Sequence, residues 1–142
     1  MKKVTFAFLG MGNRGINYSS KVERFPEEME VVAIADLRRD RLETANKIFN
    51  LPEDRLFDSA EALLAQPKMA DILVVASQDQ QHREHAIAAM EAGYDLLLEK
   101  PIAATLEDIV AVAETAKRLG RRVLVCHVLR YTVFYQEVRR LI

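Results

Sequence analysis

The chain has 142 residues, a length typical of a single domain, and 50% of them are hydrophobic while 29% are charged. Its formal net charge of −1 leaves no basic excess to attract a phosphate backbone, so nucleic acid is not an expected partner. No apolar run approaches the roughly 20 residues that a membrane-spanning helix needs, so we do not expect a membrane protein.

The start of the chain, MKKVTFAFLGMG, has the lysines and the short apolar run of a signal peptide. Gly10 and Gly12 interrupt that run before any small-residue cleavage site, which argues against secretion. Cys126 is the only cysteine, so an internal disulfide is excluded and a reducing compartment is favoured. We therefore expect a cytoplasmic protein.

Short apolar runs along the chain are predicted to be β-strands. Each is rich in Val, Ile, Leu or Ala and lacks polar alternation, which is typical of strands covered on both faces in a parallel sheet. In chain order the predicted strands are residues 4–10, 30–36, 71–77, 95–101 and 123–128.

Amphipathic segments between these runs are predicted to be helices. The predicted helices are residues 16–25, 36–49, 82–93 and 105–120. The last of them begins with Thr105 as a cap and ends in basic residues followed by Gly120. The alternation predicts an α/β fold, a Rossmann-type doubly wound parallel sheet in three αβα layers, with ligands bound beyond the carboxyl ends of the strands.

The string GMGNRG, residues 10–15, fits the pattern G-x-G-x-x-G between a predicted strand and a predicted helix. Gly10 allows the tight turn, Gly12 lets the backbone approach a pyrophosphate, and Gly15 permits close helix packing. The N-terminus of the helix would face the anion. The alternative is a glycine-rich turn that binds no ligand.

Asp36 ends the second predicted strand, about 20 residues after Gly15. A carboxylate there can accept hydrogen bonds from the adenosine ribose and would repel a 2′-phosphate, which favours NAD over NADP. Arg38 and Arg39 could instead hold a 2′-phosphate or stack on adenine, or they could be solvated charges. The sequence therefore predicts NAD, with NADP as the second choice.

The fourth predicted strand ends in an unusual way, in the string DLLLEKPIA. Its carboxyl end delivers Glu99 and Lys100 to the expected binding crevice. Pro101 ends the hydrogen-bond ladder and restricts Lys100. The ammonium could bind a substrate oxygen or exchange a proton with it, whereas the alternative is an ion pair on a surface turn.

These motifs resemble the Gfo/Idh/MocA oxidoreductases, which include glucose–fructose oxidoreductase and inositol dehydrogenases. The resemblance covers essentially the whole chain and rests on FLGMGNRG, on Ala35–Asp36, on HREHAIAAMEAGYDLLLEKPIA and on Arg130–Tyr131. It implies an NAD(P)-binding domain of an enzyme that oxidises a hydroxyl to a carbonyl, or the reverse, on a sugar, a cyclitol or a related substrate. It also implies that Lys100 positions the substrate or transfers a proton.

The same resemblance assigns cofactor-side roles. Glu99 and Pro101 would shape the cofactor site, and His82 matches a histidine of the family. The complete set of predicted cofactor-binding residues is Gly10, Met11, Gly12, Asn13, Arg14, Gly15, Asp36, Leu37, Arg38, Ser77, Gln78, His82, Glu99, Lys100, Pro101 and Arg130.

The chain also departs from the family pattern. Ser77-Gln78 stands where the family often has Thr-Pro, and no proline closely follows Arg130–Tyr131. Family members continue into a second, larger domain that supplies most substrate contacts, and we expect residues 1–142 to be the nucleotide-binding domain without it. This chain alone should then lack turnover. A redox-assisted glycosidase, or an NAD(P)-binding module without catalysis, remains an alternative parent, and the protein could form oligomers.

Four further features carry weaker functional signals. His127, after the last strand, could bind substrate or shuttle protons, or it could be a packed histidine. His82 and His85 lie one turn apart but lack a third ligand, so no metal is expected and His85 is predicted to be exposed. Cys126 is predicted to be a small buried hydrophobe. Residues 131–142 have apolar side chains at helical spacing, which predicts a linker helix that docks a second domain or packs onto the sheet.

Overall fold

The computed structural model describes residues 2–22 and 24–142. All strand pairs in its six-stranded sheet are parallel, in the order β3-β2-β1-β4-β5-β6, which is the strand order of a Rossmann fold. The strands are β1 (Val4–Leu9), β2 (Met29–Ala35), β3 (Leu56–Phe57), β4 (Ile72–Val75), β5 (Asp95–Leu98) and β6 (Val123–Val125). The predicted fold class is confirmed, and the strand order reverses direction between β1 and β4.

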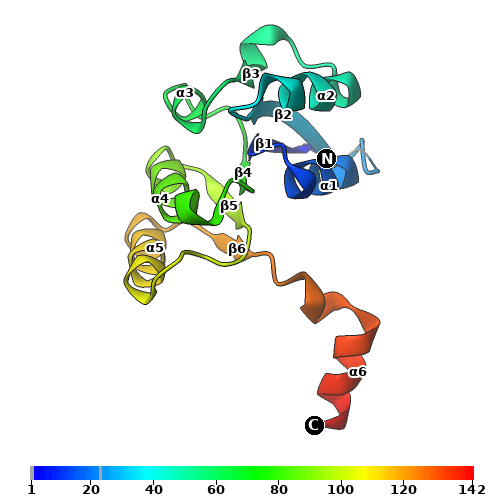
Figure 1. Ribbon diagram of the computed structural model, residues 1–142, viewed down its shortest axis with the longest axis vertical. Helices are drawn as coiled ribbons and strands as arrows, with labels where there is room; N and C mark the ends of the chain where they lie inside the picture. The colour runs from blue at the N-terminus through cyan, green and yellow to red at the C-terminus, as the bar shows by residue number, and fades with distance from the viewer. Residues whose placement is uncertain (1, 23) are drawn as a thin grey trace.

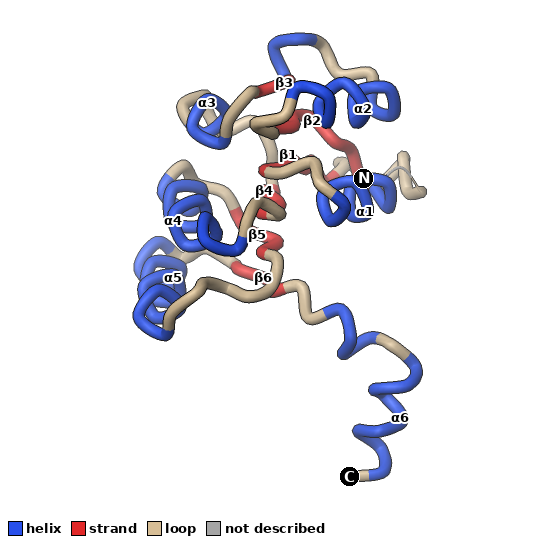
Figure 2. The backbone as a smooth tube through the Cα atoms, in the orientation of Figure 1, coloured by secondary structure: helices blue, strands red, loops and turns tan. Residues whose placement is uncertain are grey.

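Helices cover the two faces of the sheet in two groups. Figure 1 shows α1 and α2 on one face and α3, α4 and α5 on the other. The helices are α1 (Asn13–Val22), α2 (Arg39–Phe49), α3 (Ala60–Leu64), α4 (His82–Glu91), α5 (Leu106–Leu119) and α6 (Val133–Leu141). Short 3₁₀ turns complete the chain as η1 (Glu53–Arg55), η2 (Asp79–Gln81) and η3 (Val128–Tyr131), and Figure 2 shows the loops that join them.

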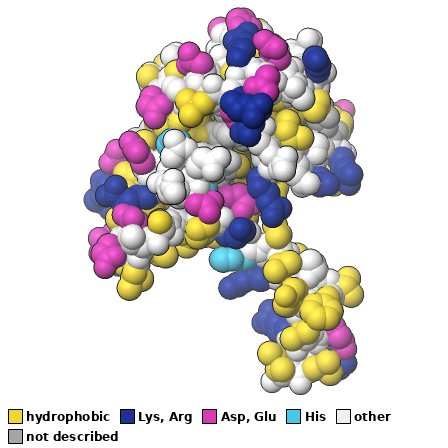
Figure 3. Space-filling view, viewed as in Figure 1, with side chains coloured by type: hydrophobic (Ala, Val, Ile, Leu, Met, Phe, Trp, Pro, Cys, Tyr) yellow, Lys and Arg dark blue, Asp and Glu magenta, His cyan; other side chains and the backbone are white. Residues whose placement is uncertain are grey.

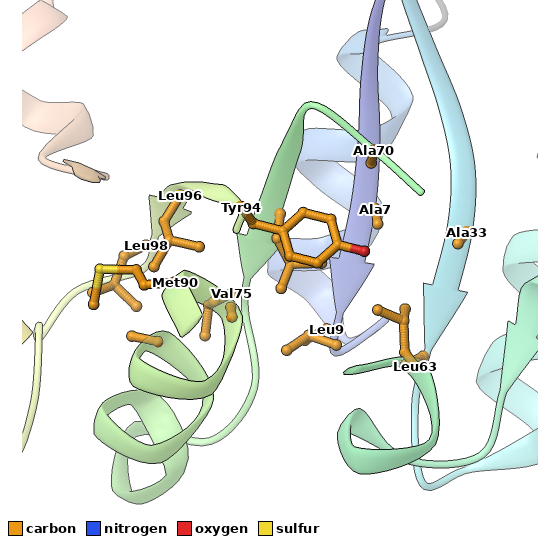
Figure 4. Packing of buried hydrophobic residues seen from close by; sticks show 14 of the residues in the cluster. Ala7, Leu9, Ala33, Leu63, Ala70, Val75, Met90, Tyr94, Leu96 and Leu98 are labelled. Carbon is orange, nitrogen blue, oxygen red and sulfur yellow. The ribbon is translucent and has the colours of Figure 1, made fainter. Parts of the chain in front are cut away.

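A separate apolar cluster fills each side of the sheet. On the side of α3, α4 and α5, Tyr94 is fully buried across the strands near Val75 and Leu9 (Figure 4). Its hydroxyl accepts a hydrogen bond of 3.1 Å from the backbone N–H of Met69, so this buried oxygen has a partner. On the other side, the second cluster packs Phe8 and neighbouring strand residues against α1 and α2. Burial on both faces holds the central strands, and therefore their carboxyl ends, in fixed positions.

Several element boundaries differ from those predicted. The two-residue strand β3 and the five-residue helix α3 were not expected, because elements this short show no periodicity. Helix α1 begins at Asn13, inside the glycine motif, and α2 begins at Arg39, since Arg38 still has an extended backbone. The expectation that every strand is covered on both faces is wrong for the edge strand β6, where Leu124 is 60% exposed.

The C-terminal helix α6 extends away from the sheet (Figure 1). None of its residues is buried, and its apolar side chains gather on the surface of a projecting arm (Figure 3). Val133, Phe134 and Leu141 are among the exposed ones. The interpretation that residues 131–142 pack onto the sheet is therefore wrong. Within residues 2–22 and 24–142, no helix has both the length and the apolar character needed to cross a membrane.

Gly10 lies where β1 and β4 come closest after their last strand residues. Its φ of +91° is a conformation that residues with a side chain rarely adopt. A Cβ added at Gly10 would lie 2.5 Å from the backbone carbonyl oxygen of Ala76. Both the backbone angle and the space at this position therefore require glycine.

We predict that Gly10→Ala strongly destabilises the fold. The left-handed backbone alone costs about 1–2 kcal/mol, and the contact with the Ala76 carbonyl adds to it. Gly120→Ala is the matched control, because Gly120 also has a positive φ, of 62°, but has open space around it. Urea unfolding should show a clearly larger loss of unfolding free energy for Gly10→Ala. Equal losses would mean that the close approach to Ala76 has no energetic weight.

Candidate functional site

A groove crosses the carboxyl ends of the central strands. Its cavity volume is about 430 Å³, and it contains the glycine motif, the end of β2 and the loop after β4. Of the predicted cofactor-binding residues, the structure brings together Gly10, Gly12, Asn13, Arg14, Asp36, Leu37, Arg38, Ser77 and Gln78 in its lining. This is the position, at the switch point of the strand order, where open α/β sheets bind ligands.

The carboxylate of Asp36 organises one end of this groove. One oxygen accepts a hydrogen bond of 2.7 Å from the backbone N–H of Met11, and the other accepts one of 2.9 Å from the backbone N–H of Arg38. Arg41 lies 3.5 Å from the first oxygen and adds a positive charge. The residue is buried, with 8% of its surface exposed. A single side chain thus ties the glycine loop to the start of α2.

The glycines of the motif differ in what surrounds them. A Cβ at Gly15 would clash with the carbonyl oxygen of Gly10, so that glycine serves the packing of α1 against the loop. A Cβ at Gly12 would meet only the guanidinium of Arg41, at an ordinary distance of 3.5 Å. Gly12 therefore leaves space in the groove lining, next to the N-terminus of α1, as a bound pyrophosphate requires.

The two arginines after Asp36 are engaged on the surface. Arg38 forms an ion pair of 2.5 Å with Asp40, while Arg39 pairs with Glu53 at 2.6 Å and with Glu43 at 3.5 Å. Arg38 lines the groove and Arg39 does not. The arrangement matches the solvated-charge interpretation for Arg39.

Two histidines hold the loop that follows β4. His82 is buried, with Nδ1 2.6 Å from the carbonyl oxygen of Pro101 and Nε2 3.2 Å from that of Ser77. It does not line the groove but joins the loops after β4 and β5. The prediction that His85 is exposed is wrong, because it is buried with Nδ1 2.8 Å from Ser77 Oγ. Burial lowers the pKa of His85 and favours its neutral form.

No metal centre is visible at these histidines. Among the described residues, which exclude only positions 1 and 23, no group of three or more His, Cys, Asp and Glu side chains is placed to hold a metal ion.

Glu99 is a second buried carboxylate at the same edge of the sheet. Tyr18 on α1 donates a hydrogen bond to it, and the backbone N–H of Lys100 donates another of 3.0 Å. Burial raises the pKa of Tyr18, and the hydrogen bond to Glu99 adds to the rise, so the phenol stays protonated as a donor. Arg14 lies 3.9 Å from the same carboxylate. Glu99 therefore connects the end of β5 to the helix that starts in the glycine motif.

Cys126 directly follows β6 and lies near Tyr18 and Glu99. The residue is buried, as predicted, and burial raises the pKa of its thiol. The thiol is consequently protonated and a poor nucleophile at neutral pH.

Three of the predicted residues that do not line the groove, namely Lys100, His127 and Arg130, are exposed. Lys100 is exposed just after Glu99, and the peptide bond between Lys100 and Pro101 is cis. His127 and Arg130 are exposed after β6, so the interpretation of His127 as a packed histidine is wrong. Met11, Gly15, His82, Glu99 and Pro101 support the site from outside the lining.

Sequence reasoning missed four polar residues that line the groove, namely Arg41, Glu61, Gln81 and His85. Arg41 lies in the first turn of α2, three residues after Arg38, so the predicted helix could have indicated it. Glu61 had no such signal, since the helix that carries it was not predicted.

Comparison with known proteins supports this interpretation of the groove. The family described as an oxidoreductase family with an NAD-binding Rossmann fold matches residues 4–127. Inositol 2-dehydrogenase of Paracoccus denitrificans is 29% identical over 82% of this chain and 34% of its own length. Glycosyl hydrolase family 109 protein 1 of Bacteroides fragilis is 34% identical over 81% of this chain and 26% of its own length.

Comparison with solved structures agrees with this family match. The WlbA dehydrogenase of Bordetella pertussis, in complex with NADH and UDP-GlcNAcA, superposes with a TM-score of 0.90 at 28% identity, over 99% of this chain and 41% of that one. The chain therefore spans well under half the length of the proteins that it matches. Since the family match covers most of the sequence and the fold and groove agree with it, the chain belongs to the Gfo/Idh/MocA oxidoreductases and comprises their NAD-binding Rossmann domain.

Proposed function

We propose that this chain is the cofactor half of an NAD-dependent oxidoreductase that interconverts a hydroxyl and a carbonyl group on a sugar, a cyclitol or a similar substrate. The buried Asp36 carboxylate in the groove, joined to the glycine loop, is the observation that carries the proposal. The substrate class is supported by the relatives, which include inositol 2-dehydrogenases and a D-glucoside 3-dehydrogenase of Escherichia coli.

The groove residues fit a dinucleotide. Gly12 and the first turn of α1 would hold the pyrophosphate, since space and unpaired helix N–H groups meet there. Asp36 would accept hydrogen bonds from the adenosine ribose and repel a 2′-phosphate. Arg38 is paired with Asp40, which supports NAD over NADP as the preferred cofactor.

The reaction requires a group that manages the proton of the substrate oxygen. The nicotinamide, when bound, supplies the hydride acceptor or donor. Lys100 would bind the oxygen and move its proton, because it stands exposed on a tip whose neighbour Glu99 is fixed by two hydrogen bonds. We place His127 at the same edge as a second polar contact for substrate.

We further propose that a second domain supplies the remaining substrate contacts. The relatives are longer, and the exposed apolar face of α6 is suited to packing against such a domain.

The match to glycosyl hydrolase family 109 protein 1 keeps a redox-assisted glycosidase as the second candidate activity. A reducing, cytoplasmic setting is consistent with a single cysteine that is buried and reduced.

The first prediction concerns the pyrophosphate position. Gly12→Val should fold normally, because its Cβ meets only a flexible side chain, yet its branches would occupy the space for the pyrophosphate. We expect NAD affinity to fall at least about tenfold, or about 1.4 kcal/mol, in calorimetric titration. Thermal unfolding without ligand serves as the control and should be nearly unchanged. Unchanged affinity in a folded variant would exclude Gly12 from the cofactor site.

The second prediction separates the charge of Asp36 from its hydrogen bonds. Asp36→Asn keeps one acceptor oxygen, for the Met11 N–H, loses the acceptor for the Arg38 N–H and removes the negative charge, so the preference for NAD over NADP should fall about tenfold. Asp36→Ala should also lower the stability, because buried N–H groups lose their partner. Parallel titrations with both cofactors measure the ratio. A ratio that does not move in Asp36→Asn places the ribose elsewhere.

The third prediction concerns Lys100. Lys100→Ala should leave NAD affinity within a few-fold, since Lys100 lies outside the groove lining. In a protein that includes the proposed second domain, the same change should reduce kcat by on the order of 10²–10⁴. Lys117→Ala, which removes an exposed lysine at the end of α5, is the control. Near-normal kcat in Lys100→Ala would show that the lysine only terminates the strand, and turnover by the 142-residue chain alone would refute the need for a second domain.

A further inference from the structure

Besides the glycine loop and the end of β2, the groove is lined by residues of α3, η2 and α4. Glu61, Gln81 and His85 line this wall together with Ser77, and we call these four residues the base wall. Helices α3 and α4 are in contact with each other, and residues of both line the same groove. None of these side chains is used by the glycine loop or by Asp36.

The order of groups in a dinucleotide directs its base toward the base wall. If the pyrophosphate lies at Gly12 and the adenosine ribose at Asp36, the base is attached to the far side of that ribose. Leu37, which follows Asp36, is 75% exposed and lines the groove. Ala60 and Ala76 line it as well. These apolar groups can cover the faces of a planar ring, while its polar edge meets the base wall.

The base wall has a defined hydrogen-bonding character. Ser77 Oγ and His85 Nδ1 are 2.8 Å apart, so these two groups are held by each other. Since burial lowers the pKa of His85, the imidazole is neutral at neutral pH. Hydrogen bonds from its own backbone N–H and from Ser59 lower the pKa of Glu61, which keeps that exposed carboxylate ionised. An ionised carboxylate only accepts hydrogen bonds.

Adenine and hypoxanthine differ in the group that would meet such an acceptor. Adenine carries an exocyclic amine, which donates, and hypoxanthine carries a carbonyl oxygen at the same position, which only accepts. An ionised carboxylate facing this exocyclic position attracts the amine and repels the carbonyl oxygen, and the N1–H donor of hypoxanthine lies one position further along the ring edge. A glutamine in its place can donate or accept, and it has no charge.

We propose that Glu61, on the preformed base wall, recognises the exocyclic amine of the cofactor's adenine and makes the site selective for that base. This inference rests on the proposed NAD site and extends it from the ribose and pyrophosphate to the identity of the base. Glu61 is a specificity-determining residue for the cofactor and takes no part in the chemistry of the substrate.

The test compares NAD with nicotinamide hypoxanthine dinucleotide by calorimetric titration of the 142-residue chain. The unchanged chain should bind NAD about tenfold more tightly, as expected for about 1.4 kcal/mol of discrimination. Glu61→Gln should bind the two dinucleotides with affinities that agree within a few-fold. Glu107→Gln is the matched control, because Glu107 occupies the same position relative to its cap, Thr105, as Glu61 does to Ser59. It should retain the full preference.

Each result bears on a different claim. Equal affinities of the unchanged chain for the two dinucleotides would overturn base recognition and leave NAD binding intact. A full preference retained in Glu61→Gln would overturn the assignment to Glu61. If the unchanged chain does not bind NAD at all, the proposed function fails and this proposal fails with it. Circular dichroism of each variant confirms that a changed affinity does not come from unfolding.

Discussion

The site depends on one constraint, the burial of the Asp36 carboxylate against two backbone N–H groups that belong to different loops. A buried carboxylate is costly unless its oxygens are hydrogen-bonded, and here both are. The glycine loop and the start of α2 cannot move apart without leaving this charge unsatisfied. The distance between the proposed pyrophosphate and ribose positions would thereby be fixed before any ligand arrives, which would reduce the ordering cost of binding.

Glu99 is a second buried carboxylate that joins two segments, on the other side of the point between β1 and β4 where the strand order reverses. Its carboxylate joins the end of β5 to α1 through Tyr18 and holds the backbone N–H of Lys100. His82 joins the loops after β4 and β5 in the same region. The loops at the carboxyl edge are thus linked laterally by buried polar side chains, while the apolar clusters on the two faces hold the strands beneath them.

The sequence alone was sufficient to predict the features that depend on local chemistry. The glycines at positions 10, 12 and 15, the acid at position 36 and the apolar runs each have one physical reason for their residue types, so the fold and most of the groove lining could be predicted. Glu61 and His85 of the base wall could not, because they come from helices α3 and α4 and are brought to the same groove only by tertiary packing. His85 was expected at the surface, whereas its hydrogen bond to Ser77 satisfies a ring nitrogen and allows burial.

Helix α6 has a consequence for local stability. It is nine residues long and has no buried residue, whereas isolated helices shorter than about 12–15 residues are marginal in water. Its backbone hydrogen bonds are therefore protected by little more than the helix itself, while those of β1 and β4 open only when the sheet unfolds. Amide hydrogen exchange along this chain should consequently divide it into two regimes, a slow sheet and a fast C-terminal arm, with the change between them after β6.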